Sequence, residues 1–171
     1  GSIVEELLRE YDGACHQSGA DGIANVWVRP EQLQAVLRKL KPKFPMLLDL
    51  SAIDERTRTH RNGQPESDFT VFYHLSALER DDDVRIKVAL SESQGIPSAS
   101  GVWPNANWYE REAYDMFGVQ FEGHPNLYRI MTPPMWEGHP LRKEHPARAT
   151  EFEPYRMSQE FLDAQQEALR F

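Results

Sequence analysis

The sequence predicts an α+β fold in which a single mixed or antiparallel sheet has helices packed on it, followed by an extended, proline-rich C-terminal tail. Residues 69–77 and 84–90 alternate apolar with polar side chains, which is the period of half-buried strands. Residues 33–40 place leucine and valine at helical spacing. Six of the twelve prolines follow Gly118, which excludes regular helix or central strand over much of that segment.

The N-terminal part of the chain predicts helix, loop, strand and helix in that order. Residues 3–11 space their apolar side chains for an amphipathic helix. Residues 12–22 are rich in glycine and serine and are expected to form a loop. A strand is expected over 23–28, and a proline at the first turn suits a second helix over 30–40.

The middle of the chain predicts strands. Residues 46–53 form an apolar strand, and the long polar connection over 54–67 suits a solvated hairpin loop and a docking loop equally. The two alternating segments that follow are joined by a short acidic turn, which predicts an antiparallel hairpin. Helices together with an antiparallel meander point to one sheet with helices on it.

The most clearly marked helix ends at Gly118, which suits a left-handed C-cap. Asn107 is placed to cap its first turn, with Glu110 as the partner in a capping box. Arg111 and Asp115 are four residues apart and are expected to pair along the helix surface. The apolar side chains share one face at helical spacing: Tyr109, Ala113, Met116 and Phe117.

Residues 119–171 are predicted to be a docking tail that follows an α+β domain over 1–118. The tail is too apolar for a disordered linker, and Ser158 is expected to cap a short terminal helix. About 50 residues without periodicity exceed what a compact domain leaves as a connection. We therefore expect a partner to supply most of the order of the tail from Gly118 to Tyr155.

Composition narrows the classes of function. The net charge of −8 and the isoelectric point of about 5.2 argue against a nucleic-acid partner. The single cysteine, Cys15, cannot form an internal disulfide, which favours a reducing compartment. No apolar run approaches the roughly 20 residues of a membrane span, so we expect a soluble chain.

Two residue patterns are found in enzymes, and neither is specific evidence for catalysis. His124, His139 and His145 lie near glutamates and suit a stand-alone metal-dependent hydrolase, but their spacing matches no ligand pattern. Glu110, Glu112 and Asp115 cluster with Arg111 and suit acid–base catalysis, but a charged helix face is more often a solvated surface or an ion-pair network. The sequence has no phosphate loop, dinucleotide fingerprint or cysteine cluster. We therefore expect no catalytic residue, redox cofactor or metal in this chain.

The tail has the composition of a binding interface. Trp136 and Leu141 are large anchors, and Arg142 and Lys143 are charges that can pair across a boundary. A tail folded back on its own domain explains the aromatic residues equally well. We assign to a partner interface Glu110, Arg111, Asp115, His124, Arg129, Trp136, His139, Leu141, Arg142 and Lys143.

One long motif resembles a known family. It runs through Glu110-Arg-Glu112, Asp115-Met-Phe-Gly118, Gly123-His-Pro-Asn-Leu127, Arg129-Ile-Met131 and Gly138-His-Pro-Leu-Arg-Lys143. This pattern resembles the signature of the C subunit, or 30-kDa subunit, of respiratory complex I, the NADH:quinone oxidoreductase. The match continues through 147–152 and resembles the N-terminal C part of the bacterial fused C/D subunit. The chain departs from the family pattern at Tyr128 and at Glu144-His145.

The resemblance implies a non-catalytic structural subunit in the hydrophilic arm of the proton-translocating enzyme, peripheral on the cytoplasmic side of a bacterial inner membrane. It implies that this subunit braces the D (49-kDa) subunit, or a fused D domain, near the quinone site and meets other subunits of the arm. FMN and the iron–sulfur clusters are implied to lie in partner subunits. The alternative within the superfamily is a homologous subunit of a related membrane-bound hydrogenase or dehydrogenase complex.

Overall fold

The computed structural model describes residues 2–60 and 63–145. The elements of this part of the chain are, in order, α1 (Ile3–Glu10), β1 (Cys15–Ser18), β2 (Ala24–Val28), the 3-10 turn η1 (Pro30–Gln32), α2 (Leu33–Leu40), β3 (Met46–Asp54), β4 (Phe69–Ala77), the 3-10 turn η2 (Leu78–Arg80), β5 (Asp82–Leu90), β6 (Ile96–Pro97), α3 (Ala106–Phe117) and β7 (Phe121–Glu122). The expected terminal helix at Ser158 lies outside the described residues.

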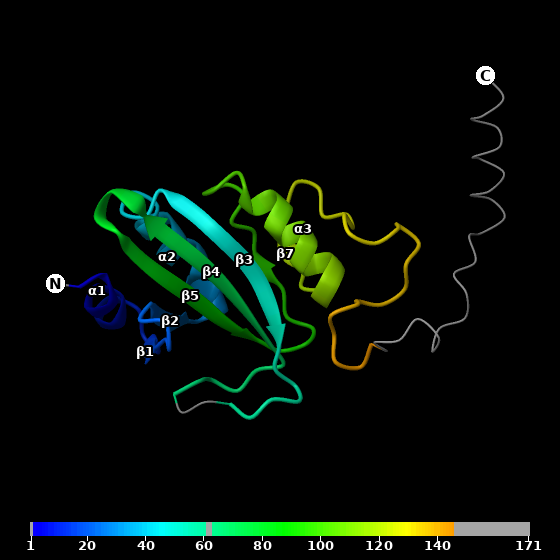
Figure 1. Cartoon of the computed structure of the whole chain (residues 1–171), viewed down its shortest axis with the longest axis horizontal. Helices are drawn as coiled ribbons and strands as arrows, with labels where there is room; N and C mark the ends of the chain where they lie inside the picture. Colours follow the sequence, from blue (N-terminus) through cyan, green and yellow to red (C-terminus); the bar gives the residue numbers. More distant parts are fainter. Residues whose placement is uncertain (1, 61–62, 146–171) are drawn as a thin grey trace, which may run out of the picture.

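The main sheet has five strands in the order β1-β2-β5-β4-β3 (Figure 1). β2 runs parallel to β5, and the other neighbouring strands are antiparallel, so the sheet is mixed. β6 and β7 form a separate parallel pair. The predicted α+β class, with one mixed or antiparallel sheet, is confirmed.

The predicted hairpin forms the centre of this sheet. β4 and β5 pair without a register shift, from Phe69 opposite Leu90 to Ala77 opposite Asp82. The predicted alternation of β5 is confirmed, because Val84, Ile86 and Val88 are buried while the residues between them are partly exposed. The α2 helix adds its apolar stripe to the same core, with its side chains fully buried at Leu33, Val36, Leu37 and Leu40.

Two short strands fall where loops are predicted. β1 lies inside the expected loop over 12–22, and β6 lies inside the irregular stretch over 91–106. β1 is the polar sequence Cys-His-Gln-Ser, so it has no strand signal of its own and forms by pairing with β2. β6 likewise exists because β7, from beyond α3, pairs with it.

The α3 helix is fixed against β3, which is an edge strand of the sheet. The Trp103 indole is buried and donates to the carbonyl oxygen of Pro45 at 3.2 Å. Asn105 and Tyr109 donate their side-chain hydrogen bonds to backbone carbonyls of β3, at Leu47 and Leu48, both at 2.8 Å. These bonds occupy part of the free edge of the sheet and orient the helix for the contacts made at its other end.

The predicted start and faces of α3 need correction. Asn105 is the N-cap residue and makes no side-chain cap, so the capping box of Asn107 and Glu110 is wrong. The C-terminus is as predicted, with Gly118 left-handed at φ 80°. Met116 and Tyr109 are only partly buried. The buried positions of the helix include two acidic residues: Ala106, Glu110, Ala113, Asp115 and Phe117.

Candidate functional site

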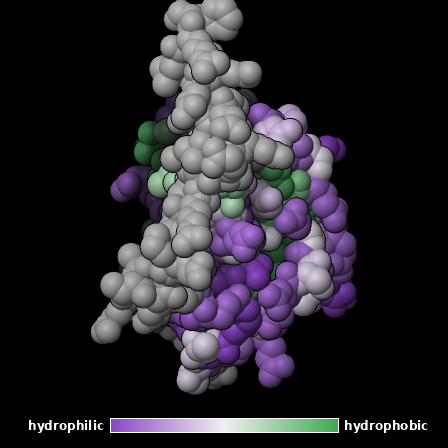
Figure 2. All heavy atoms as spheres, turned by 90° about the vertical axis from the view of Figure 1, so that its right-hand side faces the viewer, coloured by the Kyte–Doolittle hydropathy of each residue, from purple (hydrophilic) through white to green (hydrophobic). Residues whose placement is uncertain are grey.

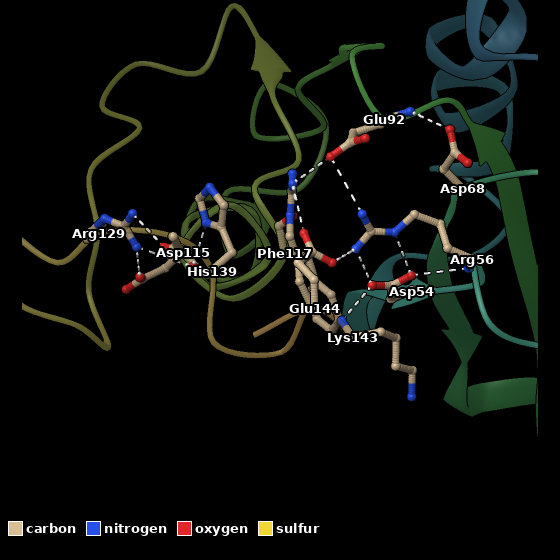
Figure 3. Close-up of polar contacts among 12 residues, drawn as sticks. Asp54, Arg56, Asp68, Glu92, Asp115, Phe117, Arg129, His139, Lys143 and Glu144 are labelled. Carbon is tan, nitrogen blue, oxygen red and sulfur yellow. Dashed lines mark hydrogen bonds and ion pairs between the residues drawn. The ribbon is translucent and has the colours of Figure 1, made fainter. Parts of the chain in front are cut away.

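The segment over 123–145, which we call the docked segment, lies on the side of α3 away from β3 and ends near the C-terminal end of β3 (Figure 1). Regular secondary structure is absent from these residues. Their position is fixed by hydrogen bonds to buried carboxylates and to the last carbonyls of α3. Figure 3 shows the two clusters that hold it, one around Asp115 and one around Asp54.

Asp115 receives a turn of the docked segment. Its Oδ2 accepts hydrogen bonds from three successive backbone amides, of Ile130 at 2.9 Å, Met131 at 2.7 Å and Thr132 at 2.9 Å. Its Oδ1 accepts from the guanidinium of Arg129 at 2.9 Å and from the Thr132 hydroxyl. The Asp115 side chain is fully buried, so every lone pair has to find its donor within the protein.

These donors decide the charge of Asp115. Burial alone raises the pKa of a carboxyl group, but the Thr132 hydroxyl, the amides of Thr132 and Met131, and Arg129 together lower the pKa of Asp115 to about 2. The predicted surface pair of Arg111 with Asp115 is therefore wrong. Asp115 turns inward and pairs with Arg129.

The docked segment also completes the C-terminus of α3. The last carbonyls of a helix have no partner within it. Here the Asp115 carbonyl accepts from His139 Nδ1 at 2.9 Å, that of Met116 from the Leu141 amide at 3.0 Å, and that of Phe117 from Arg142 Nε at 2.6 Å. A cation at this end also complements the helix dipole.

Two features of this arrangement require a glycine at position 118. Its φ of 80° is strained for any residue with a side chain. A Cβ atom at Gly118 would also lie 2.6 Å from Arg142 Nη2 and 2.7 Å from the His139 ring. The glycine thus ends α3 and leaves room for the docked segment to pack against it.

Asp54, at the end of β3, forms the second cluster. It accepts the Lys143 amide at 2.8 Å and the Arg56 guanidinium at 2.5 Å and 3.0 Å. Burial raises the pKa of Asp54, but the bonds from Arg56 and Lys143 outweigh this effect and lower it to about 2. Arg56 also pairs with Glu144 of the docked segment, so one arginine ties the sheet to the segment.

A bridge linked to the Asp54 cluster joins the docked segment to the loop after β5, since Arg56 also lies 3.5 Å from Glu92. Arg142 pairs with Glu92 at 2.9 Å, and the Glu92 amide donates to Asp68 at 2.8 Å (Figure 3). Glu92 is about half exposed, so its ion pair is a weaker tether than those made by the buried carboxylates.

Glu110 lies in a third buried site, between α3 and the loop after β6. Its carboxylate accepts from the Ser98 hydroxyl at 2.6 Å and the Ala99 amide at 2.5 Å. Burial raises the pKa of Glu110 to about 7, against the lowering effect of these two bonds. No ion pair with an arginine or lysine compensates Glu110 among the described residues.

The neighbour of Glu110 is His124. Its Nδ1 accepts from the Asn126 amide at 2.9 Å, so its Nε2 carries the proton that is donated to the Asn107 carbonyl at 3.1 Å. Nε2 lies 3.8 Å from the Glu110 carboxylate, too far for a hydrogen bond. His124 therefore fixes the start of the docked segment on α3 through these two hydrogen bonds.

The residues assigned to a partner interface divide into two groups. Glu110 turns inward and accepts from the loop after β6. Five others turn inward and hold the docked segment: Asp115, His124, Arg129, His139 and Arg142. Leu141 and Lys143 are exposed, while Arg111 and Trp136 are partly exposed. Their role at a partner interface stays a prediction.

Up to His145, the segment makes its contacts with the chain's own domain, contrary to our expectation that a partner supplies most of its order. That expectation extended to Tyr155, and residues 146–155 lie outside the described residues. Sequence reasoning also missed four residues of the anchoring clusters. These four residues are polar or charged and stand at the end of an apolar strand or in a loop, and that polarity was the one signal that the sequence offered: Asp54, Arg56, Glu92 and Thr132.

Four large side chains of α3 and the docked segment are exposed to solvent. Trp108 is 62% exposed, Tyr128 69%, Met131 64% and Leu141 54%. Figure 2 shows the molecule from the right-hand side of Figure 1, where most of the visible coloured residues are hydrophilic and a few are hydrophobic. Trp and Tyr are enriched at protein–protein interfaces, so their exposure here favours contact with another protein.

The histidines expected for a metal site do not come together. His124 and His139 hydrogen-bond to different parts of α3, and His145 stacks near Trp136. No group of three or more candidate metal ligands occurs within residues 2–60 and 63–145. No helix in the same described part is long and apolar enough to cross a membrane.

Comparisons with known proteins agree on one family. The family model described as "Respiratory-chain NADH dehydrogenase, 30 Kd subunit" matches residues 26–151. The chain is 57% identical, over 99% of its length, to the fused C/D subunit of NADH-quinone oxidoreductase from Acinetobacter baylyi, and 58% identical to that from Psychrobacter arcticus. It spans 29% and 30% of these two relatives, less than a third of their length.

Two solved structures have a similar fold. One is a trypsin-resistant fragment of Nqo5, with 27% identity and a TM-score of 0.65, which matches 73% of this chain and 96% of its own. The other is a chain of an archaeal membrane-bound sulfane sulfur reductase, with a TM-score of 0.69 over 92% of this chain and 95% of its own. At 22% identity, the second likeness concerns the fold alone.

Replacing Asp115 with alanine is expected to release the turn over 130–132. The variant leaves three amides and Arg129 without their buried acceptor, a change that costs about 3–5 kcal/mol for a broken buried pair. The amides of 130–132 should then exchange with deuterium at least about a hundredfold faster. Asp49→Ala, at an exposed position of β3, is the matched control and should leave them unchanged. Equal protection in both variants would contradict the anchoring role.

Glu110 is expected to make the stability depend on pH in the neutral range. Its pKa of about 7 in the folded chain lies above the usual 4.5, so the folded chain binds the proton more tightly than the unfolded chain. This contribution to the free energy of unfolding is full below pH about 4.5 and is lost as the pH rises through about 7.

The variant Glu110→Gln has no proton to lose at that position. Between pH about 5 and 7, the wild-type free energy of unfolding should fall relative to that of the variant, by up to about 1.4 kcal/mol per pH unit. Urea unfolding of both proteins across this range is the measurement. If the free energies of unfolding of the two proteins change in parallel over this range, the pKa of Glu110 is not raised by folding.

Proposed function

This chain belongs to the family of the 30-kDa subunit of respiratory-chain NADH dehydrogenase, and on that premise we propose that it is a non-catalytic structural subunit of a proton-translocating NADH:quinone oxidoreductase. Its place is the hydrophilic arm, where it braces the D portion near the quinone site. The family model and the C/D relatives support the assembly. The contact with D is our inference from the surface described above.

The observation that carries the bracing role is the exposure of large side chains on a segment whose backbone is hydrogen-bonded to the domain. Asp115 and Asp54 fix the backbone of the segment from inside, which leaves Met131 and Leu141 facing solvent. A surface ordered before binding loses less conformational entropy when the partner arrives. Such a surface suits a permanent neighbour better than a small substrate.

We propose further that this chain holds no FMN or iron–sulfur cluster, which would lie in partner subunits. A single cysteine in the sequence cannot supply the thiolates of a cluster. The site of action in this proposal is the cytoplasmic side of a bacterial inner membrane, with the chain attached through its neighbours. A stand-alone hydrolase has no observation in its favour, since His124 and His139 serve separate structural contacts.

The proposal is tested by assembly. The tagged chain is co-expressed with the D portion of the Acinetobacter baylyi relative, produced as a separate polypeptide, and the two are captured together. We expect one-to-one co-purification. Leu141→Asp should weaken it by at least about tenfold, because it buries a charge in an apolar contact. Leu78→Asp is the control, since Leu78 is 64% exposed on η2, outside the docked segment. Failure of the wild-type pair to co-purify would overturn the proposal.

A further inference from the structure

Arg111 differs from the other arginines of α3 and the docked segment. Arg129 and Arg142 each pair with a carboxylate of this chain. Arg111 donates from Nε to the Tyr128 carbonyl at 3.1 Å, and its guanidinium lies 5.1 Å from the centre of the Trp108 ring. Within the described residues it forms no ion pair. The carboxylate that helical spacing offers it, Asp115, is turned inward and already paired with Arg129.

The contacts of Arg111 hold it in place without using its full donor capacity. A guanidinium has five N–H donors, and the bond to Tyr128 employs the one on Nε. The two terminal nitrogens form the fork that binds a carboxylate with two parallel hydrogen bonds. Because the bond to Tyr128 and the Trp108 ring fix the side chain, binding a carboxylate there costs little further side-chain entropy.

Two exposed aromatic residues contact this guanidinium, Trp108 through its ring and Tyr128 through its backbone carbonyl. Trp108 and Tyr128 are 62% and 69% exposed, in a chain that buries Trp27 and Trp103 almost completely. Tryptophan, tyrosine and arginine are the residue types that most often dominate the energy of protein–protein interfaces. Their convergence from α3 and the docked segment makes one compact anchor patch, which we define as Trp108, Arg111 and Tyr128.

We propose that the anchor patch binds a carboxylate-bearing, apolar segment of the D portion, with the carboxylate on Arg111 and the apolar side chains against Trp108 and Tyr128. This inference rests on the proposed function. The D portion is the occupant because the relatives carry it in the same polypeptide as this sequence, which gives it a high effective concentration at this surface.

Charge determines the chemistry of that segment. The chain has a net charge of −8, so an acidic segment is repelled from most of its surface and attracted only where a cation lacks a partner. Glu112, the next residue on α3, is exposed and adds a negative charge beside the patch. Arg111 therefore fixes the register of the bound segment of D, and Glu112 opposes its binding.

Substitutions of opposite sign test the proposal. The affinity of the chain for the separately expressed D portion is measured by calorimetry for the wild type, Arg111→Glu, Trp108→Ala and Glu112→Lys. We expect Arg111→Glu and Trp108→Ala to raise the Kd by at least about tenfold. Glu112→Lys should lower the Kd, because it removes a repulsive charge and adds an attractive one.

Two controls separate the possible outcomes. Arg38→Glu makes the same charge reversal at an exposed position of α2 and should change the Kd less than about twofold. Arg111→Lys keeps the positive charge but lacks the two parallel N–H donors of the guanidinium. This variant replaces Arg111→Glu in the measurement if circular dichroism shows that Arg111→Glu does not fold. If the wild type binds D and the Arg111 variants bind as Arg38→Glu does, the patch is not the contact and the proposed function stands. If the wild type does not bind D, both proposals fall.

Discussion

Two buried carboxylates, Asp115 and Asp54, determine where the chain lies after it leaves α3. Neither the prolines nor the irregular sequence of the docked segment provides a backbone ladder, so its amides need acceptors elsewhere. Asp115 accepts three of them in a row, and Asp54 accepts the amide of Lys143. Each carboxylate also holds an arginine, Arg129 or Arg56, which offsets the cost of burying its charge.

This arrangement leaves several large side chains exposed. Asp115, Arg129 and Arg142 are used for pairing within the chain, while large side chains of the segment are left on the outside. Arg142 and His139 cover the end of α3, while Met131 and Leu141 face solvent. Large exposed side chains on a backbone anchored to its own domain suit a permanent contact with a neighbouring protein.

Much of the fold can be predicted from the sequence pattern, whereas the contacts that hold the docked segment cannot. The strands of the β4–β5 hairpin and the apolar stripe of α2 are periodic, and periodicity reports burial on one face. The faces of α3 do not follow that rule. Glu110 and Asp115 are buried because donors from distant segments meet them, Ser98 and Ala99 in one case and residues 129–132 in the other. Pattern analysis assigns charge to solvent, since the partners of a buried acid cannot be identified from spacing. β1 and β6 were missed for a related reason, because their strands depend on pairing rather than composition.

The central claim is that the chain's own carboxylates, rather than a partner, order the docked segment. Hydrogen exchange of the free wild-type chain tests it most directly, at the amides of Ile130, Met131, Thr132 and Lys143. We predict that these amides are protected in the free chain and gain little more protection when the D portion binds. Amides that exchange at the rate of an unfolded peptide in the free chain, and become protected only on binding, would contradict the account.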